Sequence, residues 1–446
     1  MSGQVRTTSP LEPLAPDMKP PESAAPAADA ADVTRVRLWR DRNFNLFWAS
    51  QTADALGDAA SLIIIPLLVL NATGSVVQMG LVTAATGITG VVATFFSGIV
   101  IDRLNRRKLM INCDIGRAVC YLLVPLSWWL WGPTIWIIYV VTVISAYLTA
   151  IFIVAYNTIV PNIVTQDQIH EANGHLQTTA ALAYITGPII AGFASTLLSP
   201  SMAVTVVAAS YVVSAVLMLL VKLRRASASP PPVEFGETKP SRFQEFMAGI
   251  RFLFNHRVLR AVTLLLIVFF FVSGATVNLA IFRLKDELHQ SDKVVGVVFG
   301  IASIGSILGG LLTATLRRKW GFGASFLGSL LLQGVAIICT GLAPSVTIMT
   351  VLATLFTFGL TVRYIATMTL RQEVTPDHLL GRVTSALITL ALVLSPIGTA
   401  LATVLAEKLG TRTILIISGL ICVGVAVIGM FTAAQTRRPV SADPVS

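Results

Sequence analysis

Charged side chains are scarce in this chain of 446 residues: Asp, Glu, Lys and Arg make up 12% of it, against about 25% in an average soluble domain. Hydrophobic residues make up 54%, and the mean hydropathy is +0.78. A soluble protein of this size would have too little polar surface to stay dispersed. The composition therefore excludes a soluble enzyme, a disordered chain and a secreted disulfide scaffold. It indicates a polytopic α-helical membrane protein, and the continuous apolar runs disfavour a β-barrel.

The sequence also lacks the motifs of metal and nucleotide chemistry. Its four cysteines form no C-x-x-C pair, and its five histidines form no H-E-x-x-H, so we expect no metal site and no disulfide framework. No G-x-x-x-x-G-K-[ST] sequence occurs, so we expect no ATP hydrolysis, no bound cofactor and no enzyme activity. The net charge of +10 comes from basic residues beside apolar runs, which is typical of anchors at anionic lipid rather than of nucleic-acid binding.

Twelve apolar runs are each long enough to cross a bilayer, which takes about 20 residues. We predict membrane spans at residues 45–70, 78–100, 108–131, 133–158, 172–198, 202–222, 258–282, 293–316, 321–342, 345–369, 379–405 and 411–434. A long connector separates the sixth span from the seventh. Phe243, Phe246, Ile250 and Leu253 recur in it at helical spacing, which predicts a short amphipathic helix on the membrane surface.

These runs predict an all-α membrane protein of two pseudo-symmetric six-helix bundles. The expected parts are a disordered cytoplasmic tail (1–42), an N-terminal bundle (43–222), a cytoplasmic linker with the amphipathic helix (223–257), a C-terminal bundle (258–435) and a cytoplasmic tail (436–446). Lys and Arg gather in the loops of one side, which places both termini in the cytoplasm. We therefore expect a multi-pass protein of the cell membrane, the inner or plasma membrane.

The two halves repeat each other at an offset of about 210 residues. The stretch from Gly98 to Lys108 matches the stretch from Gly309 to Lys319, including the order of their basic residues. Two parallel six-span repeats argue for alternating access, with the substrate site between them near the membrane midplane.

The connector between the second and third spans carries a recognisable motif. Residues 98–108 read Gly-Ile-Val-Ile-Asp-Arg-Leu-Asn-Arg-Arg-Lys. This resembles the loop 2–3 signature of the major facilitator superfamily, which is a glycine, then Asp-Arg, then a basic cluster. The resemblance covers about residues 40–435 and implies the twelve-span fold of that superfamily.

The resemblance also implies a gate at this connector. The carboxylate of Asp102 would meet the first N–H groups of the span that begins near Thr375–Leu379, and so stabilise the state closed to the cytoplasm. The second half keeps only the basic part of the motif, because Thr313 stands where Asp102 stands in the first half. The predicted gating motif consists of Gly98, Asp102, Arg103, Arg107 and Lys108.

Within this superfamily the chain is most similar to bacterial drug and natural-product exporters, including the branch with enterobactin exporters and macrolide-efflux-type proteins. The similar stretches are 43–58, 160–173 and 374–383. Two features depart from the drug–proton antiporters of the superfamily: span 4 holds no Arg or Lys, and residues 187–192 only partly match their span 5 motif. In that stretch, Gly187 and Pro188 predict a kink and close helix packing.

Two carboxylates in the first span are the strongest candidates for function. Asp54 and Asp58 are four residues apart and so lie on one helix face. Asp58 lies close to mid-bilayer, where a charged carboxylate must face a watery cavity, hold a proton or pair with a cation. We predict that Asp58 binds protons and a cationic substrate in turn; the alternative is a helix-capping or hydrogen-bonding role. Asp54 is closer to the inner surface, which favours a structural role.

Three further charged residues lie within or near spans. Asp114 and Arg117 are three residues apart near the start of span 3, which predicts a structural ion pair within one helix. Arg363 lies within span 10, eight residues before Arg371. It could act as counter-ion to an acid of the N-terminal half, contact an anionic group of the substrate, or extend to the inner headgroups. Candidate cavity-lining residues are Asn278, Ser273 and Gln333.

These features together predict a secondary-active efflux transporter that works as a monomer by alternating access. The expected substrates are amphipathic drugs, antibiotics or natural products, and the expected energy source is an inward proton gradient. One alternative is a siderophore or metabolite exporter of the same fold, and importers or passive facilitators remain open as well. An alternative of another class is a membrane receptor or assembly protein that transports nothing.

Overall fold

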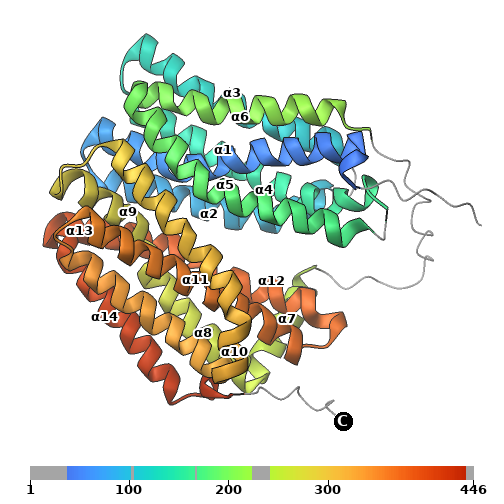
Figure 1. The fold of residues 1–446 in the computed structure, drawn as a ribbon, viewed down its shortest axis with the longest axis vertical. Coiled ribbons are helices and arrows are strands. Elements are labelled where there is room, and N and C mark those ends of the chain that lie inside the picture. Colours follow the sequence, from blue (N-terminus) through green and yellow to red (C-terminus); the bar gives the residue numbers. More distant parts are fainter. Residues whose placement is uncertain (1–37, 102–104, 166–167, 223–241, 438–446) are drawn as a thin grey trace, which may run out of the picture. The chain divides into compact units, whose positions relative to one another are not determined.

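The computed structural model describes residues 38–101, 105–165, 168–222 and 242–437, and in this part of the chain the regular elements are all helices. Six long helices form the N bundle: α1 (Arg42–Thr73), α2 (Val76–Ile101), α3 (Arg106–Trp131), α4 (Ile135–Ile159), α5 (Ile169–Leu197) and α6 (Pro200–Leu220) (Figure 1). We call the end at which α2 stops and α3 begins the inner end. The opposite end, at which α1 stops and α2 begins, is the outer end.

The second group of helices forms the C bundle. Its elements are α7 (Arg242–Asn255), α8 (Arg257–Ser273), α9 (Thr276–Phe282) with a π-helical turn (Arg283–Glu287), α10 (Asp292–Leu342), α11 (Val346–Val374), α12 (Asp377–Val393), α13 (Ser395–Leu409) and α14 (Thr411–Met430). In Figure 1 the yellow-to-red helices α8, α10, α11 and α14 lie side by side, as the packing of α10 on α11 and α14 requires.

Eleven helical stretches of the described residues are long and apolar enough to cross a membrane. One of them, α10, has 51 residues and would extend about 76 Å as a straight helix, more than twice the thickness of a hydrocarbon core. Its backbone breaks at Gly321, where φ is 85°, a left-handed conformation that favours glycine. Because α10 therefore crosses twice, the prediction of an all-α protein with twelve spans is confirmed.

Local sequence explains where several helices begin and end. Side-chain oxygens of Asp41, Asn105 and Ser345 accept hydrogen bonds from N–H groups in the first turns of α1, α3 and α11. Gly74 ends α1 with φ 65°, and its N–H donates to the carbonyl of Leu70. These caps fix where the short connectors start, and so hold neighbouring helices antiparallel.

Two spans are interrupted near their middle, and the interruptions touch each other. The first is at Gly274, between α8 and α9, and the second is at Leu394, between α12 and α13. A Cβ atom at Gly274 would lie 2.8 Å from the carbonyl oxygen of Ser395, so only glycine permits this approach. Spans 7 and 11 are therefore packed backbone to backbone at the level of their breaks.

The two bundles contact each other in their outer halves. Between described residues, three hydrogen-bonded pairs join them: Asn71–Asp292 (3.0 Å), Thr83–Asn278 (3.0 Å) and Tyr184–Ser303 (2.9 Å). Helices α5 and α10 also cross closely, because a Cβ atom on Gly192 would lie 2.7 Å from the Cα of Gly296. The outer halves of the bundles are thus closed against each other.

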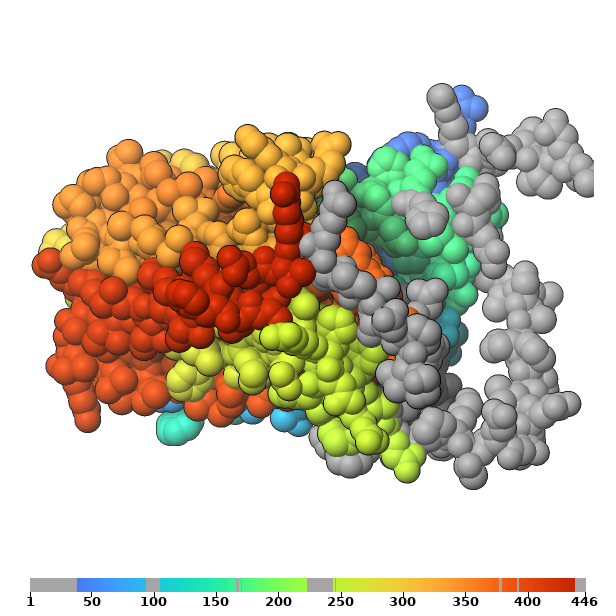
Figure 2. All heavy atoms as spheres, turned by 90° about the horizontal axis from the view of Figure 1, so that it is seen from below, coloured from blue at the N-terminus to red at the C-terminus, as the bar shows by residue number. Residues whose placement is uncertain are grey.

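The linker helix α7 packs against the C bundle. A Cβ atom on Gly249 would lie 2.7 Å from the carbonyl carbon of Arg382 in α12, and Leu253 is fully buried. Figure 2 shows the yellow-green α7 and the start of α8 beside the red end of the described chain. A shallow hollow there is lined by residues of α8 and of the chain end, including Arg257, Arg260 and Thr432. The amphipathic pattern of α7 thus buries one face on α12.

Candidate functional site

The interior of the N bundle holds a cluster of charged side chains from two helices. Helix α1 supplies Asp54 and Asp58, and α3 supplies Asp114 and Arg117. Asp58 is the seventeenth of the 32 residues of α1, about 24 Å along the helix from its inner end. The cluster therefore lies close to the middle of the bundle, away from both surfaces.

Arg117 is the centre of this cluster and is fully buried, with 0% of its surface exposed. Its Nη2 donates to Asp54 Oδ1 at 2.5 Å and to Asp114 Oδ1. Its Nη1 donates to Asp58 Oδ1 at 3.2 Å and to Thr149 Oγ1 of α4 at 3.4 Å. One guanidinium thus binds three carboxylates on two helices.

Aromatic rings from two helices pack on the Arg117 guanidinium. Its central carbon lies 4.5 Å from the ring centroid of Phe152 in α4 and 4.2 Å from that of Tyr211 in α6. Contacts of a cation with an aromatic face are attractive and strengthen when water is excluded. The rings therefore stabilise the buried charge and fix the plane in which the guanidinium binds its carboxylates.

The carboxylates have further partners that hold them in place. The Tyr211 hydroxyl donates to Asp58 Oδ1 at 2.7 Å, and the Ser214 hydroxyl donates to Asp114 Oδ2 at 2.7 Å. Gly57, next to Asp58, packs on α6: a Cβ atom there would lie 3.3 Å from the Tyr211 ring. Helix α6 thus supplies two of the hydroxyls that hold the carboxylates of the cluster.

The three carboxylates differ in their access to solvent. The side chains of Asp54 and Asp114 are 8% and 1% exposed, whereas that of Asp58 is 34% exposed. One guanidinium balances one carboxylate, and uncompensated charge in a protein interior is costly. The geometry therefore suits a site in which protons or a bound cation neutralise the remaining carboxylates, with Asp58 as the accessible group.

This cluster is larger than the predicted ion pair of Asp114 and Arg117. Asp114 does bind Arg117 within α3, but the guanidinium also reaches across to Asp54 and Asp58 in α1. The sequence holds a signal for this contact: Asp54 is twelve residues after the start of α1 and Arg117 eleven after the start of α3. Both helices start at the inner end, so the two residues lie at the same depth.

The candidate cavity residues lie elsewhere. Gln333 is fully enclosed, with 0% of its surface exposed, and a Cβ atom on Gly359 would lie 2.9 Å from its Cγ. Asn278 is also buried, and it donates to Thr83 across the closed outer halves. Gln333 and Asn278 therefore line no open cavity in this conformation, because each fills a helix contact. Ser273 is partly buried at the end of α8, beside the break of that span.

Arg363 lies inside the C bundle and does not meet the acids of the N bundle. Its guanidinium carbon lies 4.9 and 4.5 Å from the ring centroids of Phe269 and Phe270 in α8. It forms no ion pair with any described carboxylate. Only 5% of its surface is exposed, so it does not extend to the headgroups.

Part of the predicted gating motif lies outside the described residues, namely Asp102 and Arg103, while Gly98 lies in α2. Arg107 donates through Nε to the Met218 carbonyl at 3.1 Å and through Nη2 to the Leu219 carbonyl, and so caps the inner end of α6. The backbone N–H of Lys108 donates to the cap residue of α3. The contact of Asp102 with the start of span 11 stays a prediction.

The predicted kink residues of span 5 lie where α5 packs on two helices. A Cβ atom on Gly187 would lie 2.6 Å from the Cβ of Ala59 and 2.9 Å from the backbone nitrogen of Ala60, both in α1. On the other side, the carbonyl oxygen of Pro188 packs against Gly296 of α10. Residues 187 and 188 therefore join the cluster-bearing helix to the bundle contact.

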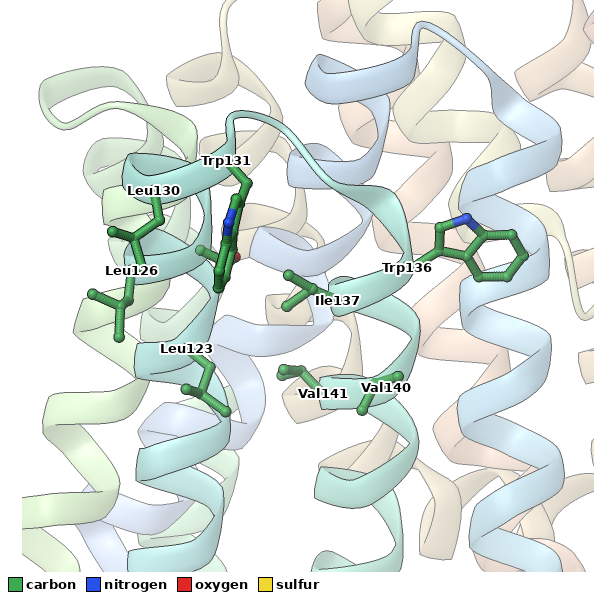
Figure 3. A pocket seen from close by; sticks show the side chains of 9 residues that line it. Leu123, Leu126, Leu130, Trp131, Trp136, Ile137, Val140 and Val141 are labelled. Carbon is green, nitrogen blue, oxygen red and sulfur yellow. The ribbon is translucent and has the colours of Figure 1, made fainter.

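A hollow with a volume of about 320 Å³ lies elsewhere in the N bundle, between the outer ends of α3 and α4. Figure 3 shows the Trp131 side chain lying between the two helices and Trp136 pointing away from them. Its lining is apolar except for Ser127 and holds no titratable side chain. Exposed tryptophans near helix ends are typical of a membrane interface, so this hollow offers lipid contact rather than chemistry.

A family model described as the Major Facilitator Superfamily matches residues 47–322 and 275–445, which together cover almost the whole described chain. The chain belongs to the major facilitator superfamily. It is therefore a multi-pass membrane transporter of small molecules and not an enzyme, and the fold expected from residues 98–108 is confirmed.

Relatives within the superfamily include proteins named as efflux pumps. Macrolide efflux protein A of Streptococcus pyogenes is 20% identical over 390 residues, which are 86% of this chain and 94% of that protein. Multidrug efflux pump Tap of Mycolicibacterium fortuitum is 24% identical over 409 residues, which are 90% of this chain and 97% of that pump. The similarity thus extends over nearly the whole length of both relatives.

Solved structures of the superfamily share the fold. A variant of the nucleoside transporter NupG matches with a TM-score of 0.72 at 12% identity, covering 87% of this chain and 99% of that one. A bacterial homologue of the iron transporter ferroportin, in its inward-facing state, matches with a TM-score of 0.63 at 16% identity, covering 87% and 98%. At such identities the likeness concerns the arrangement of helices alone.

Proposed function

We propose that this superfamily member is a proton-coupled exporter of amphipathic small molecules that works by alternating access. The observation that carries the proposal is the cluster in the N bundle, in which three carboxylates share one buried guanidinium. Two of the three negative charges have no cation of their own. Protons or a cationic substrate are the species that can neutralise them, and ions of this kind within membrane spans commonly mark transport pathways.

In the proposed cycle, Asp58 carries a proton in one half of the cycle and binds the cationic substrate in the other half. Protons from the outside neutralise the carboxylates and release the cationic substrate; loss of a proton at the inner end restores the negative charge that attracts the next substrate. Hydrogen bonds from the Tyr211 hydroxyl and from Arg117 Nη1 to Asp58 Oδ1 hold this side chain in place in its charged and its protonated form. Because Asp58 is the most exposed of the three acids, it is the group that both partners reach.

The direction of transport and the orientation of the chain in the membrane belong to the same proposal. The inner end is cytoplasmic, because the basic connectors between α2 and α3 and near Gly321 lie there. The closed outer halves correspond to a stage in which the site opens to the cytoplasm, as an exporter requires for loading. Export is supported by the full-length relatives that are named as efflux pumps. A single chain carries the cycle, with the proton gradient as its energy source.

The test is transport by the purified chain in liposomes without ATP. We expect the amphipathic cation ethidium to accumulate in vesicles with an acidic lumen, and a protonophore to abolish this accumulation. Protein-free liposomes are the control for passive binding. Accumulation only when the gradient is reversed would contradict export, and gradient-insensitive behaviour of a whole panel of amphipathic drugs, antibiotics and siderophores would contradict proton coupling.

Alternating access requires the contact between α5 and α10 to open. We expect the substitution Gly192→Val to hold these two helices apart. The valine side chain would collide with the backbone of Asp292 and Gly296. A cysteine in place of Thr83, which also lies at the contact between the two bundles, should then react with an impermeant maleimide from outside. The reaction should be about tenfold faster than in the chain that keeps Gly192. This factor corresponds to a shift of roughly 1.4 kcal/mol toward the outward-open state.

Gly174→Val is the matched control, because it introduces the same side chain in α5 where a Cβ atom would meet nothing within 4 Å. Equal labelling rates in the Gly192 and Gly174 variants would show that the close crossing is not part of the moving contact.

A further inference from the structure

Helix α11 carries two arginines that face the interior of the C bundle. Arg363 and Arg371 are 5% and 4% exposed, and Thr367, midway between them, is also 5% exposed. The two arginines are eight residues apart, or about 12 Å along the helix. Arg371 lies near the inner end of α11 and Arg363 closer to the middle, so the buried face carries one cation above the other.

Neither arginine has a carboxylate partner among the described residues. The Nε of Arg363 has no hydrogen-bond partner, and its guanidinium packs on the rings of Phe269 and Phe270. Arg371 Nε donates to the Thr367 carbonyl at 3.3 Å, while its Nη1 is buried without a partner. The nearby acid Glu373 is engaged by Arg317 at 2.8 Å.

A comparison with the equivalent helices of the N bundle shows which charged groups are missing around Arg363. Arg363 lies seventeen residues after the start of α11, as Phe152 does after the start of α4. At the offset of 211 residues that relates Gly98 to Gly309 and Phe152 to Arg363, Arg117 corresponds to Gly328. The C bundle thus has its guanidinium on the tenth span, and a glycine stands where Arg117 stands in the N bundle.

Both bundles therefore hold a buried guanidinium against aromatic rings, but only the N bundle supplies carboxylates. A buried guanidinium without a counter-charge is costly, and ring contacts return only part of that cost. Its burial also removes it from the headgroups, to which an arginine of a membrane protein otherwise extends. The observation that needs an explanation is a cation held in the protein interior with free hydrogen-bond donors and no anion.

We propose that Arg363 anchors an anion-binding site in the C bundle, which takes one compact negative group. Arg371 attracts the anion at the inner end, and the free donors of Arg363 bind it. The group is the carboxylate of a transported molecule or a free inorganic anion such as chloride. The first source rests on the proposed export function, and it extends the substrate class to amphiphiles that carry a carboxylate as well as a cationic group.

Thermal unfolding of the purified full-length protein tests this site directly. The probes are sodium chloride against sodium methanesulfonate at equal ionic strength, and decanoate against its neutral amide. We expect chloride or decanoate to raise the melting temperature of the wild type by about 2 °C or more, since a ligand of the folded state stabilises it by mass action. A response to decanoate alone identifies a carboxylate substrate, and an equal response to chloride identifies an inorganic anion.

Arg363→Met removes the charge at similar length, and we expect it to abolish both responses. Without chloride or decanoate, this variant should melt at or above the wild-type temperature, because it no longer buries an unbalanced cation. Arg363→Lys, which keeps the charge, should retain part of the response. Arg318→Met is the matched control, because Arg318 is exposed on α10 and lies outside the buried face of α11.

An unchanged anion response in Arg363→Met, or no anion response in the wild type, would overturn the proposal. Ethidium carries no carboxylate, so its proton-driven accumulation should continue in Arg363→Met. If ethidium is not transported by the wild type while the anion response is present, the export function fails and the anion site stands. The two proposals therefore fail separately.

Discussion

Replacing Arg117 with methionine will abolish proton-driven transport and strongly destabilise the protein. The substitution leaves three carboxylates, two of them almost fully buried, without the cation that binds them all. Removing one partner from a buried ion pair costs about 3–5 kcal/mol, because the other partner stays buried and unpaired. We expect a large drop in folded protein, measured by size-exclusion chromatography and thermal unfolding, together with ethidium accumulation at the level of protein-free liposomes.

Two further variants separate the loss of charge balance from the loss of function. Arg117→Met combined with Asp54→Asn and Asp114→Asn removes the cation and two carboxylates, so it should recover most of the folded protein and still not transport. Arg117→Lys should be impaired as well, because one ammonium cannot replace a planar group that bridges three carboxylates and packs on two aromatic rings. Wild-type stability of the single methionine variant would contradict the central role of Arg117.

Asp58→Asn will abolish accumulation against a gradient while leaving the protein folded. Asparagine keeps the size of the side chain and an oxygen that accepts the Tyr211 hydroxyl, but it cannot bind or release a proton. Because Asp58 is partly exposed, the melting temperature should change by no more than about 4 °C. Exchange of ethidium without a proton gradient should fall as well, because the neutral amide lacks the negative charge that attracts the cationic substrate.

The control for Asp58→Asn is Asp286→Asn, which makes the same change at an exposed position outside the cluster. It should leave accumulation and stability as in the wild type. If Asp58→Asn accumulates ethidium as the wild type does, Asp58 is not the proton carrier, and the accessible group of the site must be sought elsewhere.

The fold could be predicted almost entirely from the sequence, because membrane spans are marked by length and hydropathy alone. The exceptions are local and depend on backbone geometry. The break at Gly321 leaves two spans within one 51-residue helix, and the breaks at Gly274 and Leu394 divide two others. The breaks at Gly274 and Leu394 lie within continuous apolar runs, so no pattern in the sequence reveals them, whereas the basic residues 317–319 mark the end of the span before Gly321.

The candidate site could be predicted in part. Asp54 and Asp58 stand out because carboxylates are rare within spans, but Arg117 was interpreted through its neighbour Asp114, three residues away in sequence. The partners in α1 are some sixty residues distant, and only a comparison of depths along two helices connects them. Rotation of each helix about its axis is set by packing, so the sequence could not distinguish the enclosed Gln333 from a cavity-lining residue.

The close packing of α5 has a consequence for leakage through the carrier. At Gly187 this helix meets the backbone of α1 one residue beyond Asp58, and at Gly192 it meets the backbone of α10 in the other bundle. The side chain at these contacts is the Cβ of Ala59, which has no rotamers, so no rotamer change can absorb a displacement. A movement of α1 that follows a change of charge at Asp58 must therefore shift the bundle contact as well. Such stiffness opposes slippage, in which protons cross the membrane without cargo.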